Sequence, residues 1–169
     1  NHEAIDFSVS KFPLINVPTD VGVGLMRNDT RETLAIVSEH YHPTQYLEIT
    51  DAVEESLRQS GLDLTDAEFE TNVYDKGARL ELVAKFPAHP MKISEGDVVV
   101  PELRFRTSQN QTWANNGYVG AFRSLCYNSL VSGNVLAYVY GKHTKNFSVP
   151  QFAAKIRTAA EYIAGDGMD

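Results

Sequence analysis

Alternating and helical spacings of apolar residues divide the first part of the chain into short elements. Residues 22–28 and 33–38 each predict a strand, and the polar residues between them predict a turn. From residue 45 to residue 60, apolar side chains recur at helical spacing and acidic ones occupy the opposite stripe. We therefore expect a helix here, with Thr44 as its N-cap and Gly61 ending it in a left-handed conformation.

The middle of the chain predicts a β-hairpin. Apolar and polar residues alternate over residues 69–73 and again over residues 80–86. Between them, Asp75-Lys76-Gly77 suits a three-residue loop with the glycine in the left-handed conformation. Residues 98–107 predict a further strand, in which Pro101 indicates a sheet edge or a bulge.

The last third of the chain predicts two strands and a helix. Residues 118–130 fit both a helical stripe and strand alternation, and we favour a strand followed by a turn. Residues 135–140 predict a buried strand. Residues 149–164 predict a final helix, which Ser148 caps and Gly165 ends.

The expected order of elements is therefore β-β-α-β-β-β-β-β-α. Strands joined by hairpins, with about two helices packed on one face, define an α+β fold with a mainly antiparallel sheet. At 169 residues the chain is long enough for one domain with its own core. We expect an irregular arm over residues 1–20, a single α+β domain over residues 21–165 and a tail over residues 166–169.

Composition indicates a soluble globular protein. Apolar residues make up 43% of the chain, and a single Cys forbids an internal disulfide, as is usual in a reducing compartment. No apolar run approaches the roughly 18 residues that cross a bilayer, so we expect no membrane partner. No basic-then-apolar leader opens the sequence, which begins at Asn1. These features favour the cytoplasm.

Charge is distributed unevenly along the chain. Residues 103–157 hold seven basic side chains and no acidic one, whereas the rest of the chain holds eight basic and 22 acidic side chains. The net charge of −7 therefore conceals a +7 segment beside a −14 remainder. A basic patch can bind nucleic acid even on an acidic protein, because it acts through its local field.

Two arginines are the best placed candidates for such a contact. Arg104 and Arg106 lie two residues apart on a predicted strand, so they point the same way and can contact one ligand. An ordinary solvated sheet face is the alternative. Trp113 can stack on a base or cap the edge of the core. The other candidates are one stacking residue and three cations: Tyr118, Arg123, Lys142 and Lys145.

No catalytic or cofactor motif is present, and we expect neither cofactor nor metal. The chain lacks a dinucleotide-binding glycine motif, a Walker lysine loop and a nucleophile elbow. His40 and His42 would share a strand face, but two histidines without a Cys pair are weak evidence for zinc. Cys126 and His143 have no orienting third group, so a core position is favoured for the thiol. A nuclease would need clustered carboxylates, which the basic segment lacks, so an enzyme is disfavoured.

One stretch resembles a family encoded by phages and plasmids. Arg123-Ser-Leu-Cys126-Tyr-Asn128-Ser-Leu130, followed by Lys142-His143-Thr144, is similar to the paired elements of the domain of unknown function 932. Lys142 replaces the arginine that is usual there, and the family's His-Asp-Gly-type loop is not visible over residues 109–117. Three upstream motifs also resemble the family's N-terminal half: Arg27-Asn28-Asp29-Thr30, Leu34-Ala35-Ile36-Val37 and Tyr41-x-Pro43-x-Gln45.

The resemblance implies a mobile-element origin and action in the cytoplasm of a bacterial host, but no reaction. Its layout is similar to that of single-strand annealing proteins of phage recombination. Cys126, Asn128 and His143 would form either a buried polar brace or part of a functional surface. We therefore expect a non-enzymatic protein that binds or anneals single-stranded DNA in replication or recombination.

The alternative is a protein-interaction or self-assembly module, such as a ring-forming subunit or a phage inhibitor of a host protein. The basic face of one copy would then meet the acidic face of the next, giving a homo-oligomer.

Overall fold

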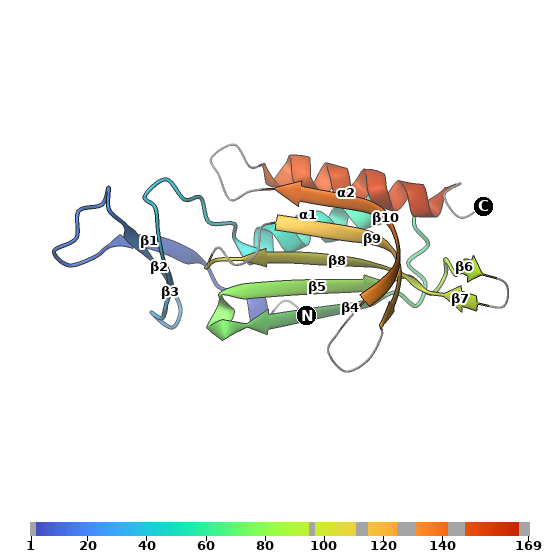
Figure 1. The fold of residues 1–169 in the computed structure, drawn as a ribbon, viewed down its shortest axis with the longest axis horizontal. Helices are drawn as coiled ribbons and strands as arrows, with labels where there is room; N and C mark the ends of the chain where they lie inside the picture. The colour runs from blue at the N-terminus through green and yellow to red at the C-terminus, as the bar shows by residue number, and fades with distance from the viewer. Residues whose placement is uncertain (1–2, 95–96, 111–114, 125–130, 142–147, 166–169) are drawn as a thin grey trace.

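Two helices cover one face of a five-stranded antiparallel sheet (Figure 1). A separate three-stranded sheet lies at one end of the molecule, and a two-stranded ribbon lies at the other end. The computed structural model describes five ranges, which are residues 3–94, 97–110, 115–124, 131–141 and 148–165. Within these ranges, no helix is both long enough and apolar enough to span a bilayer.

The five-stranded sheet has the order β10-β9-β8-β5-β4. Its strands are β4 (Glu68–Tyr74), β5 (Arg79–Lys85), β8 (Pro101–Ser108), β9 (Asn115–Ser124) and β10 (Val131–Gly141). The three-stranded sheet, which we call the wing, consists of β1 (Val9–Pro13), β2 (Val23–Arg27) and β3 (Thr33–Val37). The remaining elements are the helices α1 (Tyr46–Gln59) and α2 (Val149–Ala164), the ribbon strands β6 (Met91–Ser94) and β7 (Asp97–Val99), and the 3-10 turns η1 (Glu3–Ile5) and η2 (Asp75–Gly77).

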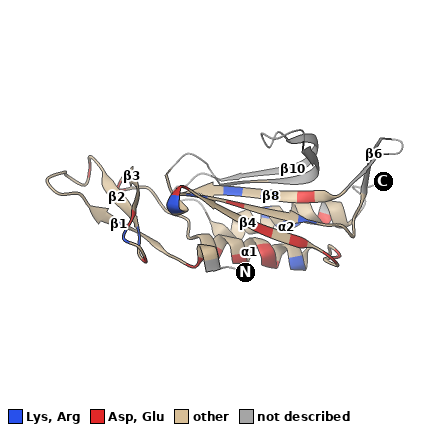
Figure 2. Ribbon diagram, turned by 90° about the horizontal axis from the view of Figure 1, so that it is seen from below, with Lys and Arg blue, Asp and Glu red and all other residues tan. Residues whose placement is uncertain are grey.

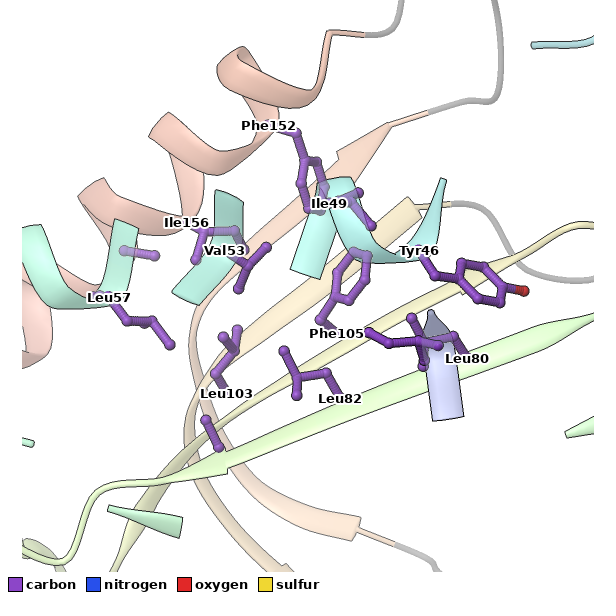
Figure 3. Close-up of a cluster of buried hydrophobic side chains, with 14 of the residues drawn as sticks. Tyr46, Ile49, Val53, Leu57, Leu80, Leu82, Leu103, Phe105, Phe152 and Ile156 are labelled. Carbon is purple, nitrogen blue, oxygen red and sulfur yellow. The ribbon is translucent and has the colours of Figure 1, made fainter. Parts of the chain in front are cut away.

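The core lies between the two helices and the helix-facing side of the sheet. Every second residue of β5 and β8 points into it, because side chains alternate between the two faces of a strand. Phe105 and the α2 residue Phe152 meet edge to face, with ring centroids 5.5 Å apart. Burying one such side chain contributes about 1.5–3 kcal/mol. The central buried residues are Ile49, Val53, Leu57, Leu80, Leu82, Leu103, Phe105, Phe152 and Ile156 (Figure 3).

The structure confirms the α+β class and an antiparallel sheet with two helices on one face. The helix ends of α2 are also confirmed: Ser148 Oγ accepts a hydrogen bond from the Gln151 backbone N–H at 3.3 Å, and Gly165 is the C-cap. Gly61, just after α1, has a φ of 86°, as expected for a left-handed stop. Thr44 as the cap of α1 is wrong, because the N-cap position is Gln45, whose side chain makes no capping bond.

The sequence patterns did not predict β1 and β6, and they joined β7 and β8 into one strand. Residues 1–20 were expected to be irregular, but Val9–Pro13 forms β1 and pairs antiparallel with β2. Residues 98–107 do not form one strand. Val99 pairs with Met91 in the ribbon, whereas Pro101 begins β8 and pairs with Ala121. β8 is a central strand rather than an edge, and Pro101 is tolerated because it is the first residue of its strand.

Close packing of α2 on β9 generates a first prediction. A Cβ atom on Gly117 would lie 2.7 Å from Ile156 Cδ1, so Gly117→Ala should destabilise the protein by about 1–3 kcal/mol through overpacking. Ile156→Val removes Cδ1 and should cost about 0.5–1.5 kcal/mol alone. The double variant should therefore be less destabilised than the sum of the two single variants, as measured by urea unfolding. Strict additivity would contradict the contact.

Candidate nucleic-acid interface

Arg104 and Arg106 lie on the face of the sheet that the helices leave uncovered. Leu103 and Phe105 point into the core, so the residues that alternate with them must point away from it. In the register of β8 with β5, Arg106 pairs with Glu81 and Arg104 pairs with Val83. Figure 2 shows basic and acidic positions along β8.

The two arginines form a line of alternating charges with two carboxylates. Arg106 Nε donates to Glu81 Oε2 at 2.7 Å, and Arg104 Nε donates to Glu102 Oε1 at 2.8 Å. Arg104 Nη1 also lies 3.7 Å from Glu81 Oε1, which joins the two pairs. We call Arg106, Glu81, Arg104 and Glu102 the Arg–Glu ladder.

The carboxylates of the ladder are more deeply buried than its arginines. The Glu81 and Glu102 side chains are 9% and 8% exposed, whereas those of Arg104 and Arg106 are 20% and 36% exposed. A buried carboxylate is costly unless it is paired and hydrogen-bonded. The arginines therefore neutralise Glu81 and Glu102 in the folded protein, in addition to any contact they make with a ligand.

Sequence reasoning missed this pairing for two reasons. Glu81 belongs to a different strand, 25 residues before Arg106. Glu102 immediately precedes the acid-free segment, whose boundary falls at residue 103. Strand alternation in the sequence does put Glu102 on the same face as the two arginines, but it does not by itself predict the ion pairs.

The backbone register continues from β8 across β9 and β10. Arg104 pairs with Tyr118, which in turn pairs with Tyr138 of β10. In the adjacent row, Arg106 pairs with Asn116, which pairs with Tyr140. The structure thus brings three of the candidate residues, Arg104, Arg106 and Tyr118, to neighbouring positions. The sequence analysis did not single out the two β10 tyrosines, because their positions depend on how β9 and β10 pair.

Three further basic residues of the segment 103–157 lie in described ranges, and none of them belongs to these two rows. Arg123 lies near the end of β9, where its backbone pairs with Ser132. Lys155 and Arg157 belong to α2 in the helix layer, and Arg157 Nε bonds Glu161 Oε1 at 2.9 Å. The basic segment is therefore divided between the two layers of the fold. The other predicted residues lie outside the described ranges: Trp113, Cys126, Asn128, Lys142, His143 and Lys145.

The histidines do not form a cation site in the described part of the chain. His40 and His42 are both exposed, and His40 Nε2 lies 3.5 Å from Glu39 Oε1. Among the described residues, no group of three or more His, Cys, Asp or Glu side chains is placed to hold a metal ion.

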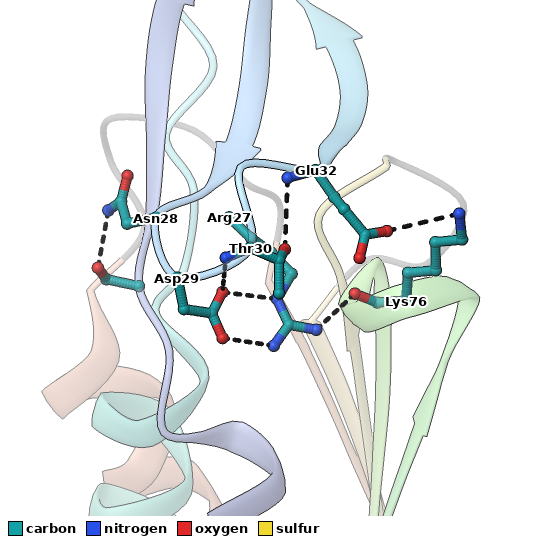
Figure 4. Close-up of polar contacts among 7 residues, drawn as sticks. Arg27, Asn28, Asp29, Thr30, Glu32 and Lys76 are labelled. Atoms are coloured by element: carbon teal, nitrogen blue, oxygen red, sulfur yellow. Dashed lines mark hydrogen bonds and ion pairs between the residues drawn. The ribbon is translucent and has the colours of Figure 1, made fainter.

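The motif Arg27-Asn28-Asp29-Thr30 joins the wing to the main sheet (Figure 4). Arg27 Nε and Nη2 donate to the two Asp29 carboxylate oxygens at 2.9 and 2.7 Å, and Nη1 donates to the Lys76 carbonyl at 2.7 Å. The guanidinium carbon lies 3.9 Å from the Phe7 ring centroid. The hydrogen bonds between Arg27 and Asp29 raise the pKa of the arginine and lower the pKa of the carboxyl.

The motif Tyr41-x-Pro43-x-Gln45 makes a second set of contacts between the wing and the rest of the fold. The Gln45 side-chain amide bonds both backbone groups of Val9, accepting from its N–H at 3.0 Å and donating to its carbonyl at 3.2 Å. Tyr41 Oη donates to the Ser108 carbonyl at the end of β8, at 3.2 Å, and burial raises the pKa of this tyrosine. These upstream motifs therefore hold the wing and the main sheet together.

A second prediction concerns the Arg27–Asp29 pair. Because the folded pKa of Asp29 is lowered, its contribution to stability is present above the unfolded pKa and is lost as pH falls through the folded pKa. Asp29→Asn should accelerate hydrogen exchange of the β2–β3 amides at neutral pH. It should also remove the loss of their protection that protonation of Asp29 causes at low pH. Asp20→Asn, in the β1–β2 loop, is the matched control. Equal exchange profiles in the two variants would contradict the conclusion that Arg27 connects the wing to the main sheet.

Comparison with protein-family models matches residues 33–164 to the domain of unknown function 932 (DUF932). The match spans β3, both helices and the whole five-stranded sheet, whereas β1 and β2 precede it. Neither the curated proteins nor the solved structures gave a match. Since the match covers most of the sequence, the chain belongs to the domain of unknown function 932 family.

Proposed function

We propose that this protein binds single-stranded nucleic acid on the helix-free face of its five-stranded sheet. The observation that supports this is the row in which Arg104, Tyr118 and Tyr138 are neighbours on three adjacent strands. Arg106 begins the next row, which ends at Tyr140. Basic and aromatic residue types thus occupy adjacent positions on one sheet.

This combination matches the chemistry of a nucleic-acid single strand. A guanidinium can make two parallel hydrogen bonds to a phosphate, and an aromatic ring can stack on an unpaired base for about 1–3 kcal/mol. Neither contact needs a catalytic group. The protein would act by binding or annealing strands during replication or recombination of a phage or plasmid, in the cytoplasm of its bacterial host.

The binding prediction is tested by fluorescence anisotropy with a labelled single strand of about 30 nucleotides at ~50 mM salt, a condition that favours phosphate contacts. The affinity should fall as salt rises. Arg106→Gln should weaken binding and reduce the slope of log K against log salt by less than about 0.7, the value for one complete phosphate contact on a single strand.

Arg157→Gln is the matched control, because it removes the same charge from the helix layer. It should leave the affinity nearly unchanged. Absence of binding by the wild-type protein at ~50 mM salt would refute the proposed function, because phosphate contacts are strong under that condition.

Self-assembly is a second candidate function, and the apolar surface of the wing favours it. The most exposed of the large apolar side chains in the described ranges are Ile15, Val21 and Ile36, at 90%, 72% and 68%. A built Cβ on Gly22 would lie 3.3 Å from Ile36 Cγ2, so β3 and the segment around Val21 meet at this surface. A second copy of the chain would bury these side chains through the hydrophobic effect.

Sedimentation velocity tests this second candidate. The wild-type protein should form dimers or larger species, and Ile36→Lys should shift it towards the monomer. Val100→Lys places the same charge on an apolar residue that is 41% exposed and adjoins the ribbon, and it should have little effect. A monomer at every concentration would exclude the candidate.

A further inference from the structure

Arg104 and Arg106 already have carboxylate partners before any ligand arrives. Their Nε atoms lie 2.8 and 2.7 Å from carboxylate oxygens of Glu102 and Glu81. Both carboxylates are nearly inaccessible to solvent, so ions in the solvent cannot readily replace the arginines as their partners. The negative charge is thus built into the sheet directly beneath the candidate phosphate contacts.

Across β4, β5 and β8, the helix-free face has no excess of positive charge. The registers of β4 with β5 and of β5 with β8 place four acidic and four basic residues on the helix-free side. These are Glu68, Glu70, Glu81, Glu102, Arg79, Lys85, Arg104 and Arg106. A phosphate that approaches Arg106 is therefore attracted by the guanidinium and repelled by the carboxylate that the guanidinium contacts.

We propose that Glu81 and Glu102 are internal competitors of nucleic-acid phosphates for Arg104 and Arg106. This inference rests on the proposed function, since it concerns how the same face is regulated. The ladder keeps the affinity for a single strand low and its salt dependence shallow, so that a bound strand exchanges readily. The carboxylates thus oppose binding while they stabilise the fold.

A positioning role would have the opposite effect and is the main alternative outcome. If the carboxylates mainly orient the guanidinium groups towards a phosphate, removing their charge would weaken binding. If they compete with the phosphate, removing their charge would tighten binding. Neutralising one carboxylate without changing its shape separates the two roles.

The test compares Glu81→Gln and Glu102→Gln with the wild-type protein, using the same labelled single strand. At ~50 mM salt each variant should bind about eightfold more tightly, and its slope of log K against log salt should be steeper by about 0.7, as expected for one added phosphate contact. Glu161→Gln is the control. It frees Arg157 from a 2.9 Å pair and raises the net charge equally, but it lies in the helix layer and should not tighten binding.

Circular dichroism and thermal unfolding establish whether each variant is folded, so that a change in binding can be distinguished from a failure to fold. Unchanged or weaker binding by a folded Glu81→Gln or Glu102→Gln variant overturns the competition. If both variants unfold, the carboxylates are structural counter-ions and the inference also falls. Suppose that the wild type binds the single strand and that Arg106→Gln weakens this binding. If neither carboxylate variant then binds more tightly than the wild type, only this inference fails. If no form binds at ~50 mM salt, the proposed function itself fails.

Discussion

The structure depends on a single constraint, which is that its two helices cover only one face of the five-stranded sheet. Strand alternation then sends Leu80 and Leu82 into the core and sends Glu81, between them, to the other side. The same alternation sends Leu103 and Phe105 into the core and Arg104 to the opposite face. Since Glu81 becomes almost completely buried on the helix-free face, it needs a cation there. The Arg–Glu ladder is therefore a consequence of how the core is covered.

The wing is held to this body by shared apolar packing and by polar side chains rather than by continuous sheet. Arg27 reaches from the end of β2 to the β4–β5 turn, and Gln45 binds the backbone of β1 from the start of α1. Tyr41 adds a bond to the end of β8, the strand that carries the arginines of the ladder. The upstream family motifs therefore have a structural role that requires no ligand. They connect the wing to the strand of the candidate interface.

Elements with a local signal could be predicted from the sequence, and elements that depend on distant partners could not. Ser148 and Gly165 bound α2 as expected, because a helix end is determined by residues next to it in the chain. β1 was missed because Pro13 only ends the strand, and its pairing with Val23 lies across a loop. For the candidate site, alternation correctly placed Arg104 and Arg106 on one face. The pairing of Arg106 with Glu81 could not be predicted, because it depends on the register with β5, whereas the pairing of Arg104 with Glu102 lies within β8.

Charges that are segregated along the sequence are partly paired in the folded structure. Residues 103–157 are purely basic in sequence, but the sheet places β8 beside β5, which contributes Glu81, and α2 carries Lys155 and Arg157 away in the other layer. Among the described residues of this segment, pairing in three dimensions thus neutralises Arg104, Arg106 and Arg157. What distinguishes the register of β8, β9 and β10 is the adjacency of arginine and tyrosine positions in neighbouring strands. Recognition on such a face would depend on stacking and directed hydrogen bonds more than on net charge, because the long-range attraction is largely cancelled within the ladder.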